Sequence, residues 1–212
     1  MNCSRVLPRA FFQQPTLEVA RELLGKVVVH HTASGTAAGA IVEAEAYSGE
    51  DDPACHAASG LTPRNAPLYG PAGYAYVYLT YGLHELLNAV TESAGYPSAV
   101  LIRALSPLKG VPVMRRRRLR ALRRGASSPD DVALCRGPAN LTRALGVTRR
   151  ENLVDLCGGA RLAIEDWGID SVCGVRVDDV RWSTRIGVAA GGDRLWRVSL
   201  GGHPAVSSHV PR

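Results

Sequence analysis

The stretch Ile41-Val42-Glu43-Ala44-Glu45-Ala46-Tyr47 alternates in character, as a β-strand with two unlike faces does. One face carries Glu43, Glu45 and Tyr47, and the other face is small and apolar and suits a core. A carboxylate beside a phenol ring can form one wall of a pocket. The pattern also fits an edge strand whose outer face is wet, and this stretch alone favours that exposed edge, because strands with one solvated face are common.

The chain has 212 residues, 46% of them hydrophobic, which is enough for one well-buried core. We expect one α+β domain over residues 1–212, a curved and mainly antiparallel β-sheet surrounded by α-helices. Residues 1–10 are expected to form a flexible arm, and residues 111–131 a basic surface segment or linker. No apolar run is long enough to span a bilayer and no signal peptide opens the chain. We therefore expect an intracellular protein without a membrane partner, in the cytoplasm or nucleoid if the cell is bacterial.

The formal net charge is +6, and the basic residues are nearly all arginines. Excess positive charge favours a polyanionic partner. Residues 115–124 hold seven arginines and predict a basic helix or arm. This segment fits a phosphate-contacting patch and an ordinary solvated surface equally well.

The five cysteines are scattered and form no C-x-x-C pair. Neither a zinc site nor a disulfide framework is indicated, so we expect free thiols in a reducing compartment. The chain also lacks a Gly-rich phosphate loop and a G-x-S-x-G elbow. We expect no metal and no cofactor.

All seven tyrosines lie between positions 47 and 96. In the predicted strand 74–82, Tyr74, Tyr76 and Tyr78 alternate on one face. They would form either a ladder that stabilises the sheet or an aromatic box that stacks flat rings. Tyr81, before Gly82 at the strand end, could instead be an exposed wedge.

Two polar residues interrupt strands that otherwise look buried. Arg103 is the single charge in the predicted strand 98–105, and an unpaired buried guanidinium is costly, so a carboxylate should lie close; Glu43 and Glu45 are the candidates. Asn88 lies in the apolar strand 83–91 and needs a partner or a role. The polar loop 48–71 contains His56 and Arg64, and loops of this length are usually functional or disordered. A single loop histidine is more often a surface residue.

The remaining pattern predicts short helices and strands around these elements. Helices are expected at 16–25, 136–146 and 149–156, and strands at 26–32, 161–165, 175–177, 185–190 and 195–200. The start of the helix after Gly137 could bind a phosphate or simply be capped.

Taken together, aromatic walls, positive charge and one carboxylate–guanidinium pair suit a nucleobase that is extruded from a duplex and stacked between rings. A cationic, alkylated base would gain a further ~0.5–2 kcal/mol from the ring faces. The chain also resembles the 3-methyladenine DNA glycosylase family of the vertebrate alkyladenine glycosylase type. The matching motifs run in the family's order: Phe11-Phe12-x-Gln14-Pro15, Leu24-Gly25, residues 41–47, His56, Thr62-Pro63-Arg64-Asn65, Tyr76-Val77-Tyr78-x-x-Tyr81-Gly82, residues 100–105, Gly137-Pro138 and Arg185-Ile186-Gly187-Val188.

The resemblance implies a role for each matching residue. Glu45 would be the general base that activates a water to attack C1′ of the damaged nucleotide, with Arg103 and the backbone carbonyl of Ile186 holding that water. The base pocket would consist of Tyr47, Tyr78, His56 and Asn88, the last excluding the amino group of guanine. Contacts with the duplex would come from Tyr81 as wedge, with Leu83 and Arg64 beside it.

Two positions depart from the family, because Leu83 replaces a methionine and His84 replaces an aromatic residue. The resemblance implies a monofunctional hydrolase of base excision repair that acts on alkylated purines in double-stranded DNA as a monomer. A lyase would need an amine nucleophile, and Lys26 and Lys109 are poorly placed for it. The alternatives are a non-catalytic binder of damaged DNA and an RNA-binding module that uses the tyrosine strand as a stacking platform.

Overall fold

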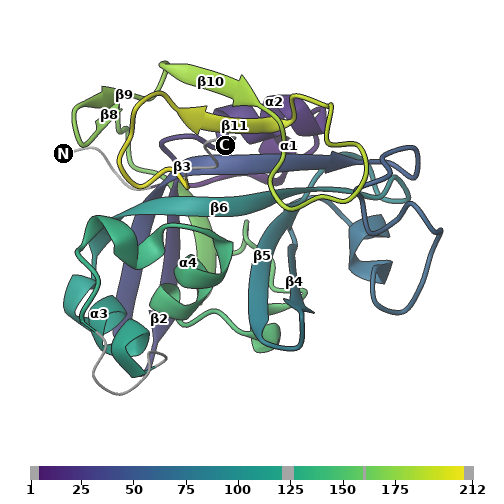
Figure 1. Ribbon diagram of the computed structural model, residues 1–212. Helices are drawn as coiled ribbons and strands as arrows, with labels where there is room; N and C mark the ends of the chain where they lie inside the picture. Colours follow the sequence, from purple (N-terminus) through teal and green to yellow (C-terminus); the bar gives the residue numbers. More distant parts are fainter. Residues whose placement is uncertain (1–4, 121–126, 160, 208–212) are drawn as a thin grey trace.

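Strand β3 (Gly35–Ser48) is the centre of the β-sheet in the computed structural model, which describes residues 5–120, 127–159 and 161–207 (Figure 1). One of its edges pairs with β6 (Ser98–Lys109) along almost its whole length. The other edge pairs with β2 (Val27–Thr32) and then with β11 (Arg197–Leu200). The interpretation of residues 41–47 as an exposed edge strand is therefore wrong, because both edges of this strand are occupied.

Further strands extend the sheet on both sides through antiparallel pairings. Beyond β2 come β7 (Leu162–Asp166) and β1 (Arg5–Val6), and beyond β6 come β5 (His84–Val90) and β4 (Ala75–Thr80); β10 (Val180–Ser183) pairs with β11. Nine strands of the described part of the chain thus form one curved sheet. Two short strands, β8 (Ser171–Val172) and β9 (Val175–Arg176), form a separate pair.

Short helices cover this sheet. Helix α1 (Arg9–Phe12) precedes α2 (Thr16–Glu22), which packs against β3 and β6, whereas α4 (Pro138–Leu145) packs against β5 and β6 and carries α3 (Val111–Arg120) (Figure 1). Three 3-10 turns complete the described elements: η1 (Ala66–Tyr69), η2 (Val132–Cys135) and η3 (Arg149–Glu151). The predicted α+β class with a curved antiparallel sheet is confirmed.

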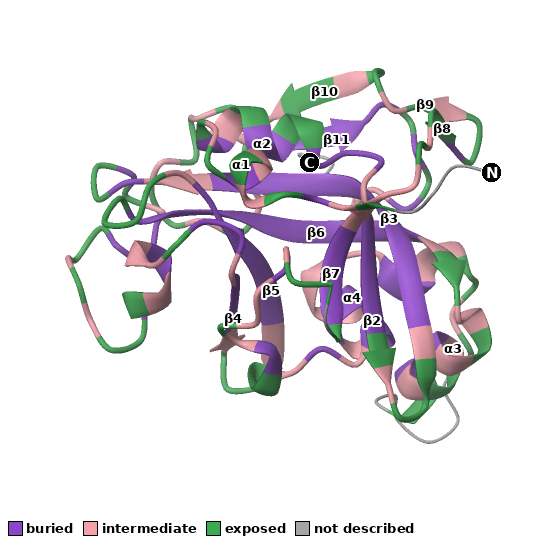
Figure 2. Ribbon diagram, turned by 180° about the vertical axis from the view of Figure 1, so that it is seen from behind, coloured by how far each residue is buried: buried purple, intermediate pink, exposed green. Residues whose placement is uncertain are grey.

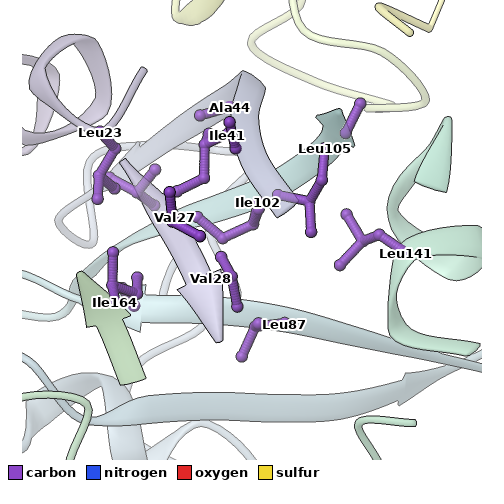
Figure 3. Packing of buried hydrophobic residues seen from close by; sticks show 14 of the residues in the cluster. Leu23, Val27, Val28, Ile41, Ala44, Leu87, Ile102, Leu105, Leu141 and Ile164 are labelled. Atoms are coloured by element: carbon purple, nitrogen blue, oxygen red, sulfur yellow. The ribbon is translucent and has the colours of Figure 1, made fainter. Parts of the chain in front are cut away.

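The core holds the two long strands in place. Val27, Ile41 and Ile102 come from neighbouring strands and pack together, with Leu23 and Leu141 at the two sides of the view in Figure 3. Burying one such side chain contributes about 1.5–3 kcal/mol. Figure 2 shows β3 and β6 buried over most of their length. The polar residues on these strands therefore sit on the most constrained part of the molecule.

Two predicted elements at the C-terminal side are wrong. The helix expected at 149–156 is only the single turn η3, which the capping box of Thr148 and Glu151 closes. The strand expected at 185–190 is a loop, because Gly187 has a φ of +75° and Arg185 binds other segments instead of a neighbouring strand. Alternation of small apolar residues could not distinguish this loop from a strand.

The N-terminal arm also differs from expectation. Residues 1–4 lie outside the described part, but residues 5–10 are docked: β1 pairs with β7, Leu7 is buried, and Arg9 forms an ion pair with Asp155 at 2.7 Å. Apolar contact and charge pairing hold this segment on the sheet edge.

The basic segment is partly used inside the fold. Arg117 donates to the carbonyl oxygens of Ala144 and Leu145 at the end of α4, at 3.1 and 2.5 Å. Arg118 is buried and donates to carbonyl oxygens of η2, and Arg115 pairs with Asp131. Residues 121–126 lie outside the described part, so a phosphate-contacting role for this segment stays a prediction. No helix in the described part has the length and apolar character needed to cross a membrane.

Candidate active site

A buried cluster of charges lies where β3 and β6 run side by side. The Nε of Arg103 donates to Glu43 at 3.0 Å, and its Nη1 donates to Glu45 at 3.1 Å. Neither carboxylate has exposed surface. The pKa of Arg103 is raised: burial alone would lower it, but the two carboxylates outweigh burial. The predicted pairing of Arg103 with Glu43 and Glu45 is confirmed.

Irregular pairing between the two strands accompanies this arrangement. The ladder runs from Ile41 opposite Leu105 to Glu43 opposite Ala104, and then to Ala44 opposite Ile102. Val42 and Arg103 therefore fall between paired residues, as the extra residues of β-bulges do. Bulges re-aim side chains and are frequent next to active sites. Here they accompany the meeting of one guanidinium with two carboxylates from the same neighbouring strand.

Glu43 joins the C-terminal segment to the sheet. Its carboxylate accepts hydrogen bonds from Nη1 of Arg197 at 2.9 Å and from the backbone N–H of Ser207 at 2.7 Å, in addition to Arg103. None of these partners lines the cavity described below. Glu43 is thus tied into the framework, although it shares a strand face and an arginine with Glu45.

Glu45 has a different set of partners. Its Oε1 accepts from the backbone N–H of Ile186 at 2.7 Å, and its Oε2 accepts from the hydroxyl of Tyr47 at 2.8 Å and from Arg103. The pKa of Tyr47 is raised by burial and by Glu45, so the phenol keeps its proton and donates it to this bond. Each carboxylate oxygen can accept about two hydrogen bonds. Among the described partners Oε2 is saturated, whereas Oε1 can accept one more.

An aromatic cavity of about 380 Å³ lies next to this carboxylate. Part of its wall is formed by Tyr47, which binds Glu45, and by Gly187, which follows Ile186. Glu45 itself is buried and does not line the cavity. The volume falls within the range of small-molecule sites. The lining residues include all four predicted pocket residues: Tyr47, Pro53, Ala54, Cys55, His56, Leu68, Tyr76, Tyr78, Thr80, Asn88, Ala99, Gly187, Val188, Ala189 and Ala190.

His56 is held by the tyrosine strand. Its Nδ1 lies 2.9 Å from the hydroxyl of Tyr76, and its ring meets the Tyr78 ring edge-on with centroids 4.4 Å apart. Burial, and secondarily Arg64, lower the pKa of His56, so the imidazole is neutral near pH 7. Burial raises the pKa of Tyr76 to about 12. With the Tyr76 hydroxyl as donor, Nδ1 accepts and the imidazole proton sits on Nε2.

Tyr76 lines the cavity, although the predicted pocket residues did not include it and the sequence assigned it only to the alternating tyrosines of a ladder or an aromatic box. It stacks on Tyr78 at 5.2 Å and lines the cavity, and its backbone carbonyl accepts from Nδ2 of Asn88 at 3.0 Å. Asn88 is buried and thus has a partner, as its apolar context required. The spacing of Tyr76 and Tyr78 on one strand face was the available signal.

The loop that contains His56 is organised by a buried amide. Nδ2 of Asn65 donates to the carbonyl oxygens of His56 and Gly60, both at 2.8 Å, and its Oδ1 accepts from the N–H of Thr62 at 2.7 Å. This one side chain therefore holds residues 56–65 of the long polar loop together. Arg64, from the same loop, lies over the Tyr78 ring at 5.7 Å and donates to the carbonyl of Leu79.

The hairpin between β4 and β5 presents two apolar side chains to solvent. Tyr81 is 87% exposed and Leu83 is 72% exposed. Tyr81 has a φ of +49° and precedes Gly82 at +65°, a tight turn that a bulky residue rarely occupies. Such strain is often retained at functional positions. Beside the turn, Arg143 of α4 donates to Nδ1 of His84 at 3.0 Å in one tautomer, which gives His84 a partner.

No group of three or more His, Cys, Asp or Glu side chains in the described part is arranged to hold a metal ion. The described cysteines, Cys55, Cys135, Cys157 and Cys173, are free. Burial raises the pKa of the Cys55 thiol, which lines the cavity in its protonated form.

Comparison with known proteins now gives the family. The profile of the methylpurine-DNA glycosylase (MPG) family matches residues 10–204. The chain belongs to this family. A relative from Methanocella arvoryzae, named "Putative 3-methyladenine DNA glycosylase", is 44% identical over 209 residues, which cover 97% of this chain and 98% of the relative.

Two further relatives carry the same name. One from Burkholderia cenocepacia is 44% identical and covers 98% of this chain and 93% of its own length. One from Clostridium acetobutylicum is 40% identical, and the alignment covers 95% of this chain and 97% of the relative. The family identifies the chain as a DNA glycosylase of DNA repair, a hydrolase that acts on N-glycosyl bonds in DNA.

Proposed function

We propose that this glycosylase removes alkylated purines of the 3-methyladenine type from double-stranded DNA, with Glu45 as general base and the aromatic cavity as the pocket for the flipped base. The observation that carries the proposal is the position of Glu45: a buried, ionically paired carboxylate whose hydrogen-bond donor Tyr47 forms the cavity wall. Burying such a pair costs desolvation energy and is weak evidence for stability alone. A function in catalysis explains why this carboxylate is kept there.

The hydrogen bonds of Glu45 indicate which oxygen acts. Oε2 already accepts from Tyr47 and Arg103, so a water would bind to Oε1, with the carbonyl of Ile186 as its second acceptor. In the reaction, one water proton passes to Oε1 while the water oxygen bonds to C1′. The bond from C1′ to the base nitrogen breaks, and its electron pair leaves with the base. Alkylation makes the base a good leaving group, and the carboxylate stabilises the positive charge that develops on the sugar.

The cavity suits a purine that has left the stack. Tyr47 and Tyr78 would stack on the base, and the ring faces favour a cationic base by ~0.5–2 kcal/mol. Neutral His56, with its proton on Nε2, would donate a hydrogen bond to the base edge. Asn88, fixed by its bond to the Tyr76 carbonyl, would exclude the amino group of guanine. Tyr81, Leu83 and Arg64 would contact the duplex from which the base is drawn.

The proposed reaction ends at an abasic site without strand cleavage. A lyase reaction needs an amine nucleophile. Neither lysine of the chain lines the cavity, and Lys26 is paired with Asp166 at 2.6 Å. All residues that the proposal uses belong to one chain, which suits a monomer.

Two neighbouring carboxylates provide the test and its control. Glu45→Gln should abolish base release from a duplex with one defined 3-methyladenine-type lesion, while affinity for that duplex stays within a few-fold. Glu43→Gln changes the same atoms on the same strand. Glu43 contacts the same arginine and is equally buried, but none of its partners lines the cavity, whereas Glu45 accepts from the wall residue Tyr47. We expect Glu43→Gln to keep most of the rate per folded molecule.

The assay is alkaline cleavage of the product, with and without an added lyase. Product cleavage should require alkali or lyase. Base release by Glu45→Gln at the parental rate would refute the assignment, and release lost equally in Glu43→Gln would show only that the cluster must stay intact.

A further inference from the structure

A second buried ion pair, separate from Arg103, lies behind the cavity. The two terminal nitrogens of Arg185 donate to the two carboxylate oxygens of Asp52 at 2.6 and 2.7 Å, and neither side chain is exposed. Arg185 also donates to the carbonyl oxygens of Ala46 at 3.1 Å and Gly191 at 3.1 Å. The four N–H groups of its terminal nitrogens thus have four acceptors on three segments.

These three segments form most of the cavity wall. Asp52 precedes residues 53–56, Arg185 precedes residues 187–190, and Ala46 precedes Tyr47, and each group lines the cavity. Asp52 also accepts from the backbone N–H of Ala54 at 3.2 Å, which fixes the start of its own loop. The pair therefore sets the distance between two loops that no β-ladder connects.

The pair also supports two of the three described donors to Glu45. Ile186, whose N–H donates to Oε1, directly follows Arg185. The guanidinium of Arg185 lies 4.8 Å from the ring centre of Tyr47, whose hydroxyl donates to Oε2 of Glu45. It also lies 5.1 Å from the ring centre of Trp196. A shift of Arg185 would move both donors and the ring that forms the pocket wall.

We infer that Asp52 and Arg185 are positioning residues, which hold Ile186 and Tyr47 in register with Glu45 and thereby set the rate of base release. The inference rests on the proposed role of Glu45. Neither residue touches the cavity, so neither is a catalytic residue. Misplacement of catalytic groups by about 1 Å is enough for a loss on the order of 100-fold in rate.

The test separates positioning from mere stability. Asp52→Asn keeps the shape of the side chain but removes its charge, and Arg185→Lys keeps the charge but offers three donors where four acceptors must be met. Base release is measured in a single turnover with enzyme in excess, below the unfolding temperature of every variant. Affinity is measured on a duplex with a non-cleavable abasic analogue, and stability by urea unfolding.

Glu151→Gln is the matched control. Glu151 is also buried and lies 3.6 Å from Arg161 and 3.9 Å from His30, but neither it nor these partners line the cavity. We expect all three variants to lose stability. Asp52→Asn should release the base at least tenfold more slowly, and Arg185→Lys at least threefold more slowly, with affinity within threefold of the parent. Glu151→Gln should stay within twofold in rate.

The outcomes separate the two proposals. A parent enzyme that releases no alkylated base would refute the proposed function itself. An active parent whose Asp52→Asn or Arg185→Lys variant keeps the parental rate, or loses affinity as much as rate, would overturn the positioning role alone. If Asp52→Asn does not fold, Arg185→Lys and its comparison with Glu151→Gln decide.

Discussion

Replacing Arg103 by methionine tests the electrostatic logic of the site directly. The buried cluster holds two carboxylates, Glu43 and Glu45, and two guanidiniums, Arg103 and Arg197, so its charges balance. Arg103→Met leaves one buried negative charge without compensation. Breaking a buried pair in this way typically costs about 3–5 kcal/mol. We expect a loss of that size in the free energy of unfolding, measured with urea at pH 7.5.

A double variant makes the prediction specific. Glu43→Gln combined with Arg103→Met leaves Glu45 and Arg197, and the cluster is neutral again. The double variant should therefore be more stable than the sum of the two single losses predicts, with a coupling of about 1–3 kcal/mol. The size of the methionine side chain is the same in both backgrounds, so packing effects cancel in this comparison.

An exposed arginine pair provides the reference. Arg115 and Asp131 form an ion pair whose side chains are 41% and 55% exposed, and such pairs contribute about 0–1 kcal/mol. Arg115→Met should cost no more than that. The reasoning fails if Arg103→Met costs no more than Arg115→Met, or if the losses of Glu43→Gln and Arg103→Met simply add.

Three further outcomes follow from the site and the core. Tyr81→Ala removes a ring that is 87% exposed, so stability should stay within about 0.5 kcal/mol while the affinity ratio of lesion to undamaged duplex falls; equal losses would count against a wedge. Tyr47→Phe removes the hydroxyl that donates to Glu45 but keeps the stacking ring, so the free energy of unfolding should drop by about 1.5–3 kcal/mol with lesion affinity retained; a matching loss of affinity would contradict this separation. Burial lowers the pKa of His30, so the unfolded chain binds a proton first and stability falls as the pH drops below 6.5. His30→Asn keeps a donor for the Leu145 carbonyl and should weaken this pH dependence in urea unfolding; an unchanged slope would refute the assignment.

The sequence predicted contacts correctly where a polar residue interrupts an otherwise apolar strand. Arg103, as the single charge in an apolar strand, required a carboxylate, and Glu43 and Glu45 meet it. Asn88 required a buried partner and has the Tyr76 carbonyl. Residues that break a buried pattern are constrained by the cost of leaving them unpaired, which makes their surroundings predictable.

The sequence patterns gave wrong predictions where contacts with distant parts of the chain determine the local structure. Alternation over residues 41–47 shows that one face is polar, but the same alternation arises whether water or an arginine from another strand meets that face. Residues 186–190 are apolar, as a strand could be, and the bonds of Arg185 to Asp52 and Ala46 make this segment a loop. These partners lie more than 130 positions away in the chain. The roles assigned to the site residues stay predictions until the variants are measured.

The balance of buried charges bears on how the enzyme would select its substrate. Glu43 and Glu45 are matched by Arg103 and Arg197. Asp52 is matched by Arg185, with the partly exposed Arg194 3.7 Å away, and His56 is neutral. These described groups therefore present a cationic base with ring faces and no net negative charge. Ring faces contribute only ~0.5–2 kcal/mol, which corresponds to a preference of about twofold to thirtyfold in binding. Under the proposed mechanism, most of the discrimination against undamaged purines must then come from the bond-breaking step, where an alkylated base leaves readily and a neutral one does not. In that mechanism the placement of Glu45 would act on the bond-breaking step, which would give a physical reason for so many buried contacts around one carboxylate.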